Sequence, residues 1–221
     1  MTVHLSGSGD LPFDANLLPA TPGQKSSLQL IFTIVVFKEV AMLTATYSIV
    51  AISAEQNNAR KILAKLQQSI SAIWKNLQEI DFASVESAVH KLTQFDQFFR
   101  SRKVERYVIP AIRNATREVD SLLAELESLS AFCLRILQSL PQQVRHVLDQ
   151  GVMKRKELRR AMELYCSNLL LRLAKEEEEL LPLVHRVLSG DEIFELAAKF
   201  LSDDSKKHEE RQSAMPPLQL T

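Results

Sequence analysis

Leucine and other apolar residues recur at steps of three and four along most of the chain, the spacing that places them on one face of a helix. This period predicts four helices, over residues 45–79, 84–111, 113–139 and 152–188, and a short fifth helix over residues 191–201. The clearest apolar stripe lies on the third helix and comprises Val119, Leu122, Leu126, Leu129, Cys133, Ile136 and Leu140. Four amphipathic helices with short connections predict an all-α, up-and-down four-helix bundle.

Residues with strong positional preferences predict where these helices begin and end. Ser84 follows a break in the apolar pattern and is a plausible N-cap for the second helix. Pro141 is expected to stop the third helix, because the residue before a proline avoids helical geometry. Gly190 is expected to cap the C-terminus of the fourth helix.

Residues 28–53 form the most apolar stretch of the chain and predict an extra N-terminal helix. Lys38 and Glu39 divide this stretch into pieces of roughly 10 to 15 residues, shorter than the ~20 that a membrane span requires. We therefore expect a helix that extends the first bundle helix or packs separately on the bundle, or that forms a homodimer interface. A membrane-associated helix is the alternative.

The two ends of the chain differ in composition from its middle. Residues 1–26 hold three of the five glycines and predict a flexible leader without a secretory signal. Residues 27–201 form the predicted bundle, and the polar residues 202–221 are expected to be a frayed tail.

Charge and cysteine content narrow the function classes. The chain has 27 basic and 27 acidic residues, a balance that weighs against a general nucleic-acid-binding protein. Cys133 and Cys166 lie on apolar helix faces and predict buried thiols in a reducing, cytoplasmic compartment. No glycine-rich phosphate loop, serine nucleophile elbow or cysteine metal cluster occurs, so the sequence favours a protein that is not an enzyme.

A short internal repeat divides the chain into two similar helix pairs. Arg100 precedes Pro110 by ten residues, and Arg172 precedes Pro182 by ten residues, each time near a predicted helix end. On the first and third helices, Gln56 and Thr116 are both followed by apolar residues at +3, +6 and +7. The pattern that starts at Gln56 is followed by the one that starts at Arg100, and the same order returns with Thr116 and Arg172. This alternation indicates one helix pair used twice.

This arrangement over residues 45–201 resembles the hemerythrin-like family, also called the HHE cation-binding domain. Its members carry a histidine on the first and third helices, and His-x-x-x-Glu on the second and fourth. The segment Leu173–Val184 is the most similar to the family motif, followed by Glu55–Leu63. The resemblance implies a four-helix bundle and a di-iron site that handles oxygen, nitric oxide or iron.

The residues at the positions implied by the resemblance differ from the family ligands. The histidine positions hold Gln56, Arg100, Thr116 and Arg172, and the glutamate positions hold Val104 and Glu176. Arginine is always protonated and donates only, so it cannot bind a cation. We therefore expect no cofactor; non-haem di-iron bound through other residues is the alternative.

The same positions predict a polar network in place of a metal centre. Its proposed members share the inward faces of the helices and are Gln56, Arg100, Thr116, Asp120, Arg172 and Glu176. Two cations and two anions would balance there, whereas the alternative places both arginine head groups at the surface. The predicted function is a regulatory or protein-interaction module with an unknown protein partner or a second copy of itself.

Overall fold

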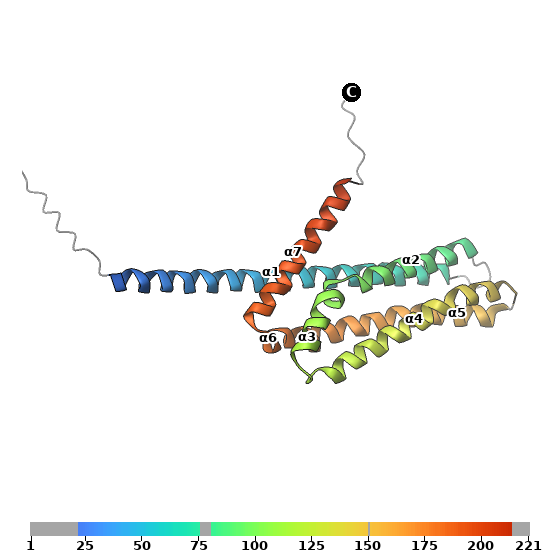
Figure 1. Ribbon diagram of the computed structural model, residues 1–221. Coiled ribbons are helices and arrows are strands. Elements are labelled where there is room, and N and C mark those ends of the chain that lie inside the picture. The colour runs from blue at the N-terminus through green and yellow to red at the C-terminus, as the bar shows by residue number, and fades with distance from the viewer. Residues whose placement is uncertain (1–21, 76–80, 150, 214–221) are drawn as a thin grey trace, which may run out of the picture. The chain divides into compact units, whose positions relative to one another are not determined.

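The computed structural model describes residues 22–75, 81–149 and 151–213, and every element within these ranges is helical (Figure 1). The α-helices are α1 (Pro22–Ile73), α2 (Phe82–Arg100), α3 (Ile109–Ala115), α4 (Asp120–Asp149), α5 (Gly151–Lys175), α6 (Leu181–Val187) and α7 (Gly190–Ser213). Two π-helical turns, η1 (Val104–Val108) and η2 (Glu176–Leu180), precede α3 and α6. The predicted all-α class is confirmed for these residues.

The chain divides into two units, Met1–Val40 and Ala41–Thr221. Helix α1 begins at Pro22, inside the predicted leader, and runs without a break to Ile73. The apolar residues 28–53 therefore extend the first helix, which is one of the two arrangements expected from the sequence. The rest of the leader and the packing of side chains 22–42 lie outside the described residues.

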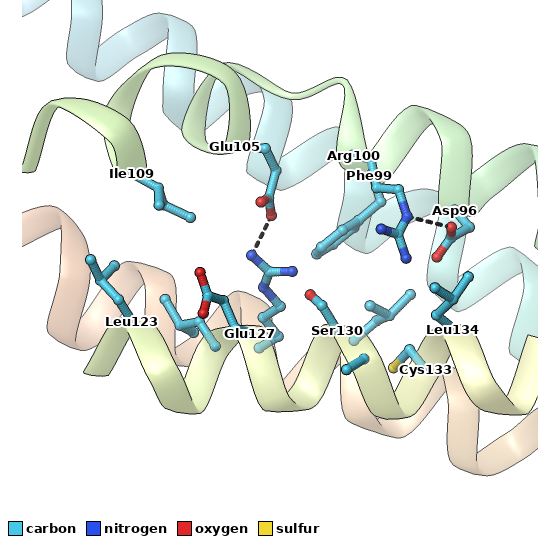
Figure 2. A pocket seen from close by; sticks show the side chains of 14 residues that line it. Asp96, Phe99, Arg100, Glu105, Ile109, Leu123, Glu127, Ser130, Cys133 and Leu134 are labelled. Atoms are coloured by element: carbon cyan, nitrogen blue, oxygen red, sulfur yellow. Dashed lines mark hydrogen bonds and ion pairs between the residues drawn. The ribbon is translucent and has the colours of Figure 1, made fainter. Parts of the chain in front are cut away.

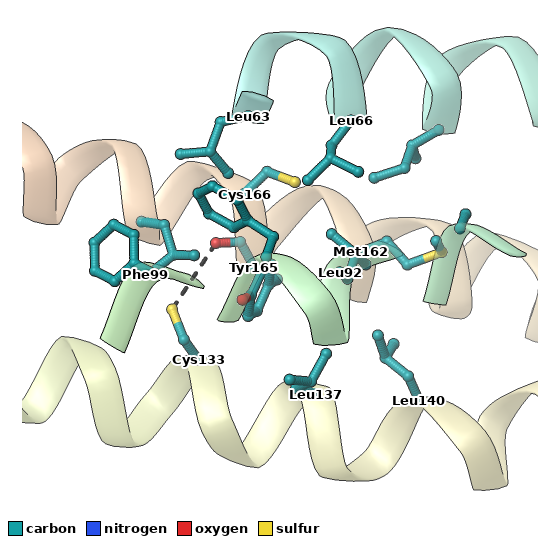
Figure 3. Close-up of a cluster of buried hydrophobic side chains, with 14 of the residues drawn as sticks. Leu63, Leu66, Leu92, Phe99, Cys133, Leu137, Leu140, Met162, Tyr165 and Cys166 are labelled. Carbon is teal, nitrogen blue, oxygen red and sulfur yellow. Dashed lines mark hydrogen bonds between the residues drawn. The ribbon is translucent and has the colours of Figure 1, made fainter. Parts of the chain in front are cut away.

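Four helices of the second unit bury side chains in one hydrophobic core (Figure 3). Its buried members are Ala59, Leu63, Leu66, Ile70, Trp74, Val85, Ala88, Leu92, Phe95, Phe99, Cys133, Leu137, Leu140, Val144, Leu158, Met162, Tyr165, Cys166, Leu169 and Leu173. They come from α1 and its C-terminal flank, α2, α4 and α5, at the three- and four-residue steps that amphipathic helices require.

A second core gathers the π-helical turns and the last helix. It contains Val104, Val108 and Leu180 from η1 and η2, and Leu196 and Phe200 from α7. Helix α7 runs to Ser213, so the prediction of a frayed tail from residue 202 is wrong up to that residue. Side-chain contacts with distant segments, described below, hold this polar part of α7. The polarity of residues 202–213 does not predict these contacts.

The structure also corrects three predicted helix boundaries. Asp81, not Ser84, caps α2, and its carboxylate accepts hydrogen bonds from the backbone N–H groups of Ala83 and Ser84. Pro141 lies inside α4, where burial of the flanking Leu140 and Val144 compensates for the one backbone hydrogen bond that proline removes.

Gly190 begins α7 instead of capping the helix before it. The start of α7 is a capping box formed by Ser189 and Glu192. Ser189 Oγ accepts from the Glu192 N–H, and the Glu192 carboxylate accepts from the Ser189 N–H. This reciprocal cap explains why a helix can start immediately after α6 without a longer connection.

Candidate functional site

The two Arg-to-Pro repeats form the same local structure. The turn η1 begins at Val104 and η2 begins at Glu176, each six residues before its proline. The backbone N–H of the residue before the proline donates to a carbonyl five residues back, from Ile109 to Val104 and from Leu181 to Glu176. The sequence repeat therefore marks two π-helical turns.

Proline chemistry explains these turns. A proline ring clashes with the carbonyl four residues earlier, and proline has no N–H to bond it. Widening the preceding turn by one residue relieves this clash and leaves the first residue of the π-helical turn facing inward. Val104 and Glu176 are both buried, and Glu176 is a charged residue with no exposed surface.

Glu176 is held by the guanidinium group of Arg102. Arg102 Nη1 donates to Glu176 Oε2 at 2.9 Å and Nη2 donates to Oε1 at 2.9 Å. Both side chains are fully buried, at 0% exposure. This parallel arrangement of two charge-assisted hydrogen bonds is the strongest geometry available to an arginine–carboxylate pair.

Gln56 closes a ring with this pair. Its Nε2 donates to Glu176 Oε2 at 2.8 Å, and its Oε1 accepts from Arg102 Nη1 at 2.8 Å. Because an amide carries both a donor and an acceptor, Gln56 satisfies the anion and the cation together.

Arg172 and Glu105 extend the ring to a network of two cations and two anions. Arg172 Nε lies 3.1 Å from Glu176 Oε1, its Nη2 pairs with Glu105 Oε1, and Arg102 Nη2 lies 3.4 Å from the same Glu105 oxygen. Burial raises the pKa of Glu105, and the nearby Glu176 carboxylate adds to the rise, while Arg172 and Arg102 limit it. We call Gln56, Arg102, Glu105, Arg172 and Glu176 the central network.

The Phe99 ring lies against the cationic half of the central network. The guanidinium carbon of Arg102 is 3.6 Å from the ring centroid, and that of Arg172 is 5.5 Å from it. Arg102 Nε also donates to the Phe99 carbonyl at 3.0 Å. The aromatic face therefore stabilises buried positive charge that water cannot reach.

Of the six residues predicted from sequence, the structure brings together Gln56, Arg172 and Glu176. Arg100 lies outside the central network, half exposed, and its Nε donates to Asp96 Oδ2 at 2.7 Å. Thr116 follows the end of α3, and its Oγ1 accepts from the Glu118 N–H at 3.2 Å. Asp120 is exposed at the start of α4, 3.7 Å from Arg117.

Sequence reasoning missed Arg102 and Glu105 because the helical register changes between them. Helix α2 ends at Arg100, and η1 begins at Val104. A 3.6-residue period continued from α2 therefore places Arg100 on the inward face, whereas the structure places Arg102 there. The spacing of Pro110 from Val104, matched by that of Pro182 from Glu176, was the available signal for this change.

A second set of ion pairs attaches α7 to α1 and η1. Lys103 Nζ lies 3.3 Å from Glu55 Oε1 and 2.7 Å from Asp204 Oδ1. The hydroxyl of Tyr47 donates to Asp204 Oδ2 at 2.8 Å. Together with Asp203, described next, these residues form what we call the α7 clasp.

Asp203 is the buried acidic residue of the α7 clasp. Its Oδ1 accepts from Arg106 Nη1 at 2.5 Å, and its Oδ2 lies 2.8 Å from Lys207 Nζ. Burial opposes ionisation of Asp203 and Asp204. The combined attraction of Lys207 and Arg106 for Asp203, and of Lys103, Tyr47 and Lys207 for Asp204, outweighs it and lowers the pKa of each carboxyl.

Both cysteine thiols are buried core groups, as the sequence predicts. Burial raises the pKa of Cys133 to about 11 and that of Cys166 to about 12. The reactive thiolate is therefore scarce at neutral pH, and neither residue has the character of a nucleophile.

A cavity of about 350 Å³ lies beside the central network (Figure 2). Residues of α2 and η1 line one side, among them Phe99, Arg100 and Glu105, and residues of α4, among them Ser130, line the other. Arg172 lines the same cavity, so the central network and the cavity share two charged side chains, Glu105 and Arg172.

Within the described residues, no three His, Cys, Asp or Glu side chains are grouped so that they could hold a metal ion. The central network offers two carboxylates, Glu105 and Glu176, and both are paired with arginine.

Among the described residues, no helix combines the length and hydropathy needed to cross a bilayer. Comparison of the chain with protein-family models, curated proteins and solved structures finds no match.

Proposed function

We propose that this chain is a non-enzymatic protein-interaction or regulatory module, built as an up-and-down four-helix bundle of the hemerythrin-like kind without a working di-iron site. Support for the bundle comes from the core shared by α1, α2, α4 and α5 and from the sequence resemblance. The convergence of Gln56, Arg172 and Glu176, three of the six positions that the resemblance implies, supports the same view.

The observation that carries the proposal is the pairing of Arg102 with Glu176. Glu176 is the one residue that keeps the family's ligand type, and both of its oxygens already accept hydrogen bonds from Arg102. A metal ion at Glu176 would have to displace this pair and lie beside two guanidinium groups that cannot lose their charge.

An exposed apolar surface on α1 supports a binding role. Leu43, Ile49 and Val50 are 66%, 47% and 59% exposed. Seven residues after Val50, the same side of the helix carries the exposed polar residue Asn57. Apolar side chains clustered on a surface mark sites of protein contact, so α1 is the surface at which we place a partner or a second copy.

Elemental analysis of the purified chain tests the metal part of the proposal. Protein expressed with added iron and manganese should contain far less than one metal ion per chain, and it should show no oxo-bridged di-iron absorption. About two iron atoms per chain, the complement of di-iron bundle proteins, would overturn the proposal.

A further inference from the structure

We propose that the cavity beside Arg172 binds a small organic monocarboxylate with a short apolar tail. This inference concerns a site separate from the α1 surface, and it stands whether or not the chain has a protein partner.

The cavity has the size and lining of a small-molecule site. Its volume of about 350 Å³ falls at the lower end of the range of about 300–1,000 Å³ that such pockets occupy. Arg172 and Leu126 are buried at its inner wall, whereas Arg100 and Glu127 are exposed and mark its mouth. Figure 2 shows Phe99 and Arg100 on one side and Ser130 and Leu134 on the other.

Two buried polar atoms at this cavity have no aligned hydrogen-bond partner. Ser130 Oγ is buried and accepts or donates no hydrogen bond. Arg172 Nε lies 3.1 Å from Glu176 Oε1 but is not aligned with it as a hydrogen bond. Buried polar groups are almost always paired in folded proteins, so an oxygen acceptor inside the cavity would complete both.

The charges around the cavity favour a single negative charge. At the mouth, Arg100 is paired with Asp96, and Glu127 is paired with Arg113. At the inner wall, Glu105 faces Arg172 of α5, Arg102 and the Glu176 carboxylate of η2. A ligand carboxylate can replace Glu105 as the partner of Arg172 if Glu105 takes up one proton from solvent.

This exchange conserves the charge of the site. One anion enters and one proton is bound at Glu105, whose pKa burial already raises, so the buried charge stays balanced. A dianion such as sulfate would leave one charge uncompensated next to Glu176. The apolar walls formed by Ile109, Leu123 and Leu126 suit a hydrocarbon tail. The ligand class that fits both the charge and the walls is therefore a monocarboxylate with an apolar tail.

Titration calorimetry of the full chain with hexanoate, hexanamide and inorganic sulfate tests the proposal. We expect hexanoate to bind more tightly at about pH 5.5 than at about pH 7.5, with proton uptake revealed by buffers of different ionisation enthalpy. Hexanamide and sulfate should bind at least about tenfold more weakly, because hexanamide carries no charge and sulfate carries two negative charges.

Three variants locate the site. Ser130→Ala should weaken hexanoate binding by about tenfold, whereas the control Ser139→Ala, whose hydroxyl already donates to Ile136 O, should leave it unchanged. Glu105→Gln should abolish the proton uptake, and Leu134→Trp should block binding by filling a partly exposed position of the wall. Thermal melts check that each variant folds.

Equal affinities for hexanoate and hexanamide, or affinities unaffected by Ser130→Ala and Leu134→Trp in folded protein, would overturn the inference. So would the absence of binding at both pH values. None of these results bears on the metal content of the chain, so failure here is distinguishable from failure of the proposed function.

Discussion

The residue types of the central network follow from what each side chain can donate or accept. Arg102 offers a planar fork that matches the two oxygens of Glu176, a fit that a lysine ammonium group would not reproduce. Gln56 contacts a cation and an anion at once, which neither glutamate nor lysine could do without adding an unpaired charge. The ring is thus specific to the three residues present.

Breaking the Arg102–Glu176 pair should cost more than removing it whole. Glu176→Leu leaves two buried guanidinium groups with one carboxylate, and loss of one partner of a buried pair costs about 3–5 kcal/mol. The double variant Arg102→Met with Glu176→Leu should recover a large part of this loss in the free energy of unfolding, measured by urea melts.

The exposed pair Arg186–Glu118 provides the control for this comparison. Arg186→Met removes the same charge from a solvent-exposed pair and should leave the urea midpoint nearly unchanged. If Glu176→Leu lowered the urea midpoint as little as Arg186→Met does, the central network would not be buried as described.

At the scale of elements, two prolines control the register of the helices that build the site. Pro110 and Pro182 each stand at the start of a short helix that follows a π-helical turn. These turns position Glu105 and Glu176 beside the arginines, so a feature usually regarded as a helix defect supplies both anions of the central network.

The α7 clasp predicts an acid-sensitive attachment of the last helix. Because the pKa of Asp203 and of Asp204 is lowered in the folded state, their stabilisation is present above the ordinary aspartate value of 3.8 and is lost as the pH falls through the lower folded values. Urea midpoints should therefore fall as the pH drops below about 4.

Asp203→Asn separates this effect from general acid unfolding. The variant loses the ion pairs to Arg106 and Lys207, so it should be less stable than the native chain at neutral pH and show a flatter decline in acid. Parallel pH profiles for the variant and the native chain would contradict a role for Asp203 in attaching α7.

At the scale of the whole molecule, local periodicity predicts the core but not the contacts between distant segments. Leu126, Cys133 and Leu140 are buried as the apolar stripe predicts, because the spacing of apolar residues along one helix shows which of its faces is buried. Lys103 illustrates the limit, since its partner Asp204 is 101 residues away in a segment whose polarity indicates a tail. Gln56, Arg172 and Glu176 were predicted correctly because α1 keeps its register around Gln56 and α5 keeps it up to Glu176, the first residue of η2.

The α1 surface predicts self-association that depends on the apolar part of this helix. Deleting residues 1–40 removes the first unit and, with it, residues 28–40, the first half of the apolar stretch 28–53. Light scattering should show the full chain as a dimer and the truncated chain as a smaller species. An unchanged mass for the truncated chain would show that residues 1–40 are dispensable for association.

Matched substitutions on α1 refine this prediction. Val50→Glu places a charge within the exposed apolar cluster and should weaken the dimer, because burying an unpaired carboxylate at an interface is costly. Asn57→Glu, seven residues later on the same exposed side, should leave the mass unchanged. Equal effects of the two substitutions would argue against an interface at Leu43, Ile49 and Val50.

Trp74 gives the molecule an intrinsic optical reporter. It is the one tryptophan of the chain, and its ring is buried in the core shared by α1, α2, α4 and α5. Its emission should shift to the red when that core opens to water. Helix α7 contributes to the other core, so its release in acid should leave the emission colour unchanged while lowering the helical circular dichroism signal. Fluorescence and dichroism recorded along one acid titration should thus resolve two separate steps.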